Sequence, residues 1–116
     1  MIPAHIFENL TRLDQLEMQY NHLPTIPAHL FDKLTSLKRL ILKNNSISSI
    51  PEEMLQKTKS LAMLDLSENN ISVLPTCVFS SLSKLFNLKL QRNRLTRLSK
   101  VTLHLVIHSA ANQTTL

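Results

Sequence analysis

The fold is decided by residues 37–47, LKRLILKNNSI, because the spacing of this stretch recurs along most of the chain. The stretch has the form L-x-x-L-x-L-x-x-N-x-L, and its defining residues are Leu37, Leu40, Leu42, Asn45 and Ile47. The same form returns at 13–23, where Met18 takes one Leu place, and at 61–71 and 85–95, so that neighbouring copies lie 24 residues apart. A fixed period of this length predicts a stack of structural repeats.

The period divides the chain into four units and a remainder. The units are 2–25, 26–49, 50–73 and 74–97, and the remainder is 98–116. Proline recurs with the same step, at Pro3, Pro27, Pro51 and Pro75. We interpret the remainder as a partial fifth repeat or an irregular C-terminal tail. Within it, residues 101–107 alternate well enough to predict a strand.

The L-x-L core of each unit predicts a short strand. In the second unit Leu40 and Leu42 point to one side of the strand and Ile41 to the other, because side chains alternate along an extended chain. One unit cannot bury its apolar side alone, so neighbouring units must stack with their strands parallel. An asparagine follows each strand, and its amide can donate and accept where the backbone turns inward. We therefore expect a structural ladder of Asn21, Asn45, Asn69 and Asn93.

This motif resembles the leucine-rich repeat family over residues 2–97. The linking pattern I/L-P-x-x-x-F-x-x-L-x-x-L is similar to that of extracellular members such as Toll-like receptors, Slit proteins and small proteoglycans. It departs in the third unit, where Leu55 replaces Phe and Thr58 replaces Leu. The resemblance implies an α/β solenoid with short parallel strands on a concave face and turns or short helical segments on a convex face. It also implies non-enzymatic recognition of a protein or peptide partner.

The amino-acid composition excludes most other functional classes of protein. The 116 residues contain no glycine, which removes phosphate-binding and dinucleotide-binding loops, and one cysteine, Cys77, which removes an internal disulfide framework. The net charge of +5 is spread along a chain with few aromatic residues, so no nucleic-acid partner is predicted. His5 and His29 lie at equivalent places in successive units, but no converging ligand set accompanies them. We predict no enzyme, metal or cofactor, and a buried or half-buried Cys77.

The variable positions of the strands form the candidate binding face. Ile41, Met63 and Phe86 are apolar at positions expected to face solvent, on successive units. An exposed apolar cluster with a charged rim is typical of a binding site, so we predict partner contacts from Arg39, Ile41, Met63, Phe86 and Lys89. Charges alternate from unit to unit, and pairing of Asp14 with Lys38 and of Asp65 with Lys89 is the structural alternative.

Targeting segments and glycosylation sequons bear on the cellular location of the protein. No signal segment, paired-cysteine cap or membrane segment is found, so we interpret the chain as a fragment of a longer parent or a truncated product. Sequons stand at Asn9, Asn44, Asn70 and Asn112. The sequons favour a parent protein that is extracellular or at the cell surface. Such a parent could be anchored in the membrane by a segment outside this chain. An intracellular scaffold in the cytoplasm and a product without independent function remain the alternatives, and no oligomeric state is predicted.

Overall fold

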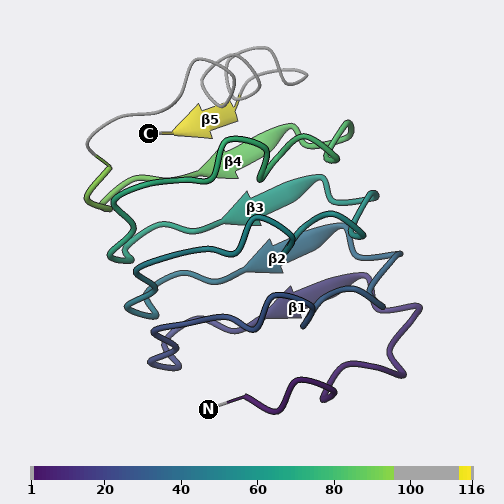
Figure 1. Cartoon of the computed structure of the whole chain (residues 1–116). Coiled ribbons are helices and arrows are strands. Elements are labelled where there is room, and N and C mark those ends of the chain that lie inside the picture. Colours follow the sequence, from purple (N-terminus) through teal and green to yellow (C-terminus); the bar gives the residue numbers. More distant parts are fainter. Residues whose placement is uncertain (1, 96–112, 116) are drawn as a thin grey trace.

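The computed structural model describes residues 2–95 and the strand at 113–115. The chain winds as a stack of coils, each with one short strand on the same side (Figure 1). The strands are β1 (Gln15–Glu17), β2 (Arg39–Ile41), β3 (Met63–Asp65), β4 (Asn87–Lys89) and β5 (Gln113–Thr115). They form one parallel sheet in the order β1-β2-β3-β4-β5, which confirms the predicted solenoid with parallel strands.

The sequence period sets the register of the sheet. Leu16, Leu40, Leu64 and Leu88 stand opposite one another on successive strands, each 24 residues from the last. The final step is longer, because Gln113 of β5 stands opposite Asn87 of β4. The strand expected at 101–107 lies outside the described residues.

The core fills the space between the strands and the opposite side of each coil. Leu40, Leu42 and Leu64 from the strand side are fully buried, as are Phe31 and Leu34 from the opposite side. That opposite side consists of turns closed by short backbone bonds, such as Leu34 N–H to the Phe31 carbonyl at 3.0 Å. Of the two predicted alternatives, the described residues contain turns and no helix.

The irregular third unit keeps its place in this core. Leu55, which stands where the other units have Phe, is fully buried. Thr58, which stands where the others have Leu, is also fully buried, and its hydroxyl donates to the Leu55 carbonyl at 3.2 Å. A buried hydroxyl without such a bond would be destabilising, so this bond explains how a polar residue replaces an apolar one here.

The asparagines after the strands link each coil to its neighbours. Asn45 is fully buried, and its Oδ1 accepts the Asn21 N–H at 2.7 Å. Its Nδ2 donates to the Met18 carbonyl of the preceding coil at 2.9 Å and to the Leu42 carbonyl of its own coil at 3.0 Å. Asn69 repeats this arrangement one coil later, where its Oδ1 accepts the Asn45 N–H at 2.8 Å. These bonds satisfy backbone groups that leave the sheet and turn into the core.

The residue before each ladder asparagine has a left-handed backbone although none of these residues is glycine. The residues and their φ angles are Tyr20 (62°), Asn44 (55°), Glu68 (56°) and Arg92 (60°). Such a conformation costs about 1–3 kcal/mol for a residue with a Cβ atom. Its recurrence at one place in every coil indicates that the ladder geometry imposes it.

We predict that Asn45→Ala lowers the free energy of unfolding by about 2–4 kcal/mol, because it leaves buried carbonyl and N–H groups without partners. Asn70→Ala is the matched control, since Asn70 is exposed, and we expect a change of about 0.5 kcal/mol or less. Urea unfolding followed by circular dichroism measures both. Equal losses for the two variants would contradict a structural role of the ladder.

Candidate functional site

The outward-pointing side chains of the strands and their flanking residues form one surface, which we call the strand face. It is the face that the sequence analysis expected to be concave. Phe86 lies on it with 42% of its surface exposed, and Arg39 is exposed, whereas Lys89 is half-buried. Of the five predicted contact residues, Phe86 and Arg39 are therefore the two that are exposed to solvent.

The expected exposure of Ile41 and Met63 is wrong, because each is only 7% exposed. Both belong to central strands with a neighbour on either side. Ile41 stands between Glu17 and Asp65, and Met63 stands between Arg39 and Asn87. Side chains on adjacent strands are about 5 Å apart at Cβ, so the flanking residues shield the middle one. Ile41 and Met63 therefore form the floor of the strand face, and Phe86 rises from it.

Asp65 stands at the centre of this floor and is 7% exposed. It lies in register with Lys89, as expected, but within the described residues its carboxylate accepts hydrogen bonds from its own coil. Its Oδ1 accepts the backbone N–H of Ser67 at 3.0 Å and the Ser67 hydroxyl at 2.5 Å. Among the described residues, the ion pairs of the strand face do not join Asp65 to Lys89 or Asp14 to Lys38.

The ion pairs lie instead beyond the carboxyl ends of the strands. Glu68 contacts Lys43 of the preceding coil at 3.2 Å and Arg92 of the following coil at 3.4 Å. With Gln91 these three residues line a hollow of about 300 Å³. This triad was not predicted from the sequence: Lys43 and Glu68 stand one place apart in their repeats, and the equivalent places Glu68 and Arg92 were not compared. The alternation of charge from unit to unit was the available signal.

The triad alters the proton affinity of its lysine. The hydrogen bond from Lys43 to Glu68, and the negative charge of Glu68, raise the pKa of Lys43 above its ordinary value of 10.5. A raised pKa means that the pairing stabilises the fold below pH 10.5 and that this stabilisation is lost as Lys43 deprotonates at higher pH.

The other residues singled out in the sequence are dispersed. His5 pairs with Glu8 at 3.5 Å and His29 with Asp32 at 3.0 Å, both on the turn side of the coils. In the described part of the chain, no group of histidine, cysteine and carboxylate side chains could hold a metal ion. Cys77 is exposed, which corrects the expected burial, because its turn directs Val78 and Phe79 into the core in its place.

Three of the four sequon asparagines, Asn9, Asn44 and Asn70, are exposed, and Asn112 lies outside the described residues. Within the ranges that the structure describes, no helix is long and apolar enough to cross a membrane.

We predict that Ile41→Ala and Met63→Ala each lower the free energy of unfolding by about 1–3 kcal/mol, because both side chains are buried. Phe86→Ala should cost less than either, since 42% of its surface is already in solvent. Chemical denaturation of the three variants measures the difference. A larger loss for Phe86 than for the other two would contradict this division into floor and exposed anchor.

We predict that Glu68→Gln lowers the pKa of Lys43 towards 10.5, because it removes the negative charge that favours the ammonium form. NMR titration of the lysine Cε resonances measures this pKa. Glu52→Gln is the matched control on the opposite side of the coil, and it should leave the pKa of Lys43 unchanged. An unchanged pKa in Glu68→Gln would show that the ion pair does not persist in solution.

Comparisons with known proteins agree with this architecture. A family model described as Leucine rich repeat matches residues 1–47 and 35–95. The crystal structure of the leucine-rich repeat domain of APL1B superposes with a TM-score of 0.85 at 28% sequence identity. The match covers 97% of this chain and 32% of the APL1B chain. Toll, in the Drosophila Toll–Spatzle complex, superposes with a TM-score of 0.85 at 30% sequence identity. The match covers 90% of this chain and 14% of the matched chain.

A leucine-rich repeat protein of Leptospira interrogans shares the fold, with a TM-score of 0.80 at 23% sequence identity. The match covers 100% of this chain and 28% of the Leptospira protein. The chain thus spans a third or less of the length of these solved structures. The comparison with curated proteins found no match. The repeated motif, the register of the strands and the family match together show that this chain belongs to the leucine-rich repeat family, whose fold is in general a scaffold for protein interaction and is generally non-enzymatic.

Proposed function

We propose that this chain recognises a protein or peptide partner through its strand face, with Phe86 as the apolar anchor. The observation that carries the proposal is the exposure of Phe86, which keeps 42% of its surface in solvent on a face where Ile41 and Met63 are buried. Aromatic residues at the centre of an interface contribute much of its binding energy. Binding of a partner would remove the exposed apolar surface of Phe86 from water, which is favourable.

The surroundings of Phe86 indicate the chemistry of the partner. Lys38, Ala62 and Phe86 occupy the same place on successive coils, and the Phe86 N–H donates to the Ala62 carbonyl at 3.0 Å. Lys38 is exposed and has no ion pair among the described residues, and Arg39 beside it is exposed as well. An apolar anchor on a face that also carries exposed Lys38 and Arg39, two coils away, favours a partner segment that carries an apolar side chain and acidic residues.

The predicted contact set changes accordingly. Arg39, Phe86 and Lys89 remain the proposed partner-contacting residues. Ile41 and Met63 support them from below, since their burial leaves little surface for a partner to cover.

We further propose that the chain functions in an extracellular setting, as part of a receptor ectodomain. Two similarities support this placement, those to APL1B at 28% identity and to Toll at 30% identity. The exposure of Asn9, Asn44 and Asn70 leaves these three sequons accessible for glycosylation. Toll is solved in complex with Spatzle, which is an example of a relative that binds a protein.

A displayed library of random peptides, selected on the immobilised chain, tests the proposed binding face. We expect Phe86→Ser to weaken the selected peptides by about ten-fold or more, because it removes the anchor. Val73→Ser is the matched control, since Val73 is 57% exposed and lies away from the strands. Selected peptides should also be rich in acidic residues. Peptides that bind Phe86→Ser as tightly as the unchanged chain would contradict the proposed anchor.

A further inference from the structure

Cationic side chains gather on the segments that lead into the interior strands. The segments are 32–39, 56–63 and 80–87, and they enter β2, β3 and β4 from the same side of the stack (Figure 1). Together they contain six cationic residues and a single carboxylate, that of Asp32. We call the six cations the basic flank, and they are Lys33, Lys38, Arg39, Lys57, Lys59 and Lys84. All six are exposed.

The 24-residue repeat brings these cations together although they are dispersed in the sequence. Leu37, Leu61 and Leu85 each donate an N–H to the carbonyl three residues earlier, at 3.1–3.2 Å, so the three segments share one turn. Lys33 and Lys57 therefore occupy equivalent places in adjacent coils. Because neighbouring strands of a sheet are about 4.8 Å apart, side chains of adjacent coils lie within reach of one extended ligand.

The basic flank is not neutralised by other side chains in the part of the chain that the structure describes. The ion pairs there involve His5, His29, Lys43 and Arg92, and none of these belongs to the flank. Asp32, the single carboxylate, pairs with His29 at 3.0 Å. The equivalent segment of the first coil, 8–15, carries two carboxylates beside one arginine, so the repeat itself does not require these cations. A cluster of like charges creates a positive potential that attracts an anionic ligand.

The remaining residues of the flank indicate which kind of anion it fits. Apart from the cations and Phe86, the exposed residues of the three segments are Thr35, Ser36, Gln56, Ser80 and Ser83. Hydroxyl and amide groups of this kind hydrogen-bond to sugar hydroxyls, while lysine and arginine form charge-assisted bonds to anionic oxygens. This composition favours a strongly hydrated, anionic polysaccharide.

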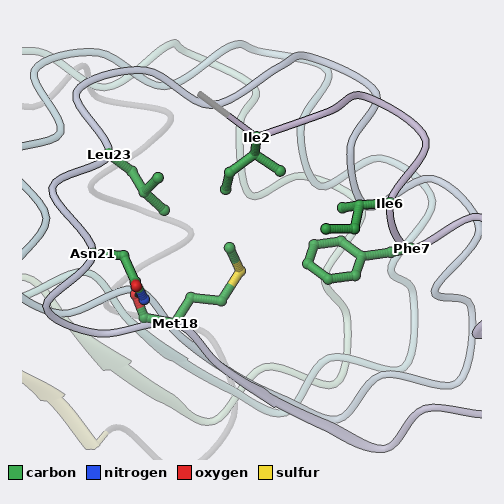
Figure 2. A pocket seen from close by; sticks show the side chains of 6 residues that line it. All are labelled: Ile2, Ile6, Phe7, Met18, Asn21 and Leu23. Atoms are coloured by element: carbon green, nitrogen blue, oxygen red, sulfur yellow. The ribbon is translucent and has the colours of Figure 1, made fainter.

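The flank lacks the apolar surface that other polyanions use. Protein interfaces centre on aromatic and other large side chains, and single-stranded nucleic acids stack their bases on aromatic rings. Within the three segments Phe86 is the single exposed aromatic residue. Apolar side chains gather elsewhere, as around the hollow of about 250 Å³ in the first coil, where Figure 2 shows Ile6 and Phe7.

We propose that the basic flank binds a sulfated polysaccharide, whose sulfate groups are held by cations of successive coils. A linear polyanion that lies across the coils contacts Lys33, then Lys57, and then Lys84. Each such contact releases counterions, so the affinity falls as the salt concentration rises. The proposal rests on the extracellular setting proposed above, where such polysaccharides occur, and does not depend on the recognition of a peptide by Phe86.

Calorimetric titration of the chain with a heparin dodecasaccharide, at about 0.15 M salt, tests the proposal. We expect binding that weakens as salt is added. The same oligosaccharide without its sulfates keeps its carboxylates and should bind about ten-fold more weakly or worse, because most of its charge is lost. Absence of binding to heparin, or equal binding of the desulfated form, overturns the proposal. Equal or tighter binding of single-stranded DNA, polyglutamate or phosphatidylserine vesicles overturns the assignment to a polysaccharide.

A double variant, Lys33→Gln with Lys57→Gln, locates the site. It should weaken heparin binding by about 2- to 30-fold, because two exposed charge contacts are lost. Arg92→Gln with Arg94→Gln is the matched control, since both arginines are exposed, lie beyond the opposite ends of the strands and make the same change in net charge. Circular dichroism checks that both variants keep the fold. Equal losses in the two double variants, or no loss with the lysines replaced, overturn the proposal.

The outcome is independent of the proposed peptide-binding face. A chain that binds heparin and selects no peptide keeps the basic flank as a site and refutes Phe86 as an anchor. A chain that selects peptides through Phe86 and does not bind heparin refutes the present proposal alone.

Discussion

The asparagine ladder is the constraint on which the rest of this structure depends. Each strand has three residues, too few to hold a sheet together by themselves, and the chain must turn inward immediately afterwards. At that turn Asn45 bonds at once to its own coil and to the coil before it. Because the same side chain fixes the turn and the distance between coils, the spacing of the strands and the burial of the leucines both follow from it.

The ladder also explains how a chain without glycine makes such sharp turns. Tyr20, Asn44, Glu68 and Arg92 differ in size and charge, yet all adopt a left-handed backbone before their ladder asparagines. The penalty of about 1–3 kcal/mol for each residue is tolerated because bonds on both sides of the turn determine its geometry. This conformation directs Glu68 between Lys43 and Arg92, so the ion triad is a consequence of the ladder.

The sequence predicts the features that the 24-residue repeat determines, such as strand register. It does not predict the features that depend on side chains of adjacent strands, such as burial on the strand face. A step of 24 residues predicts that Leu40 faces Leu64, and the structure has this register. Alternation alone predicts that Ile41 and Met63 leave the core, but it says nothing about side chains on the adjacent strands that shield them. The longer step to β5 was also beyond prediction, since the motif fails in the last residues and no period remained to set the register.

Function in such a stack is expected where the repetition is broken. At equivalent positions an interior coil satisfies its neighbours, so that Leu42 and Leu66 are fully buried and contribute stability alone. Phe86 breaks this pattern, because it stands in a column otherwise occupied by Asp14, Lys38 and Ala62. Its ring carries apolar surface that no repeat covers, and burial of that surface by another molecule would stabilise the complex.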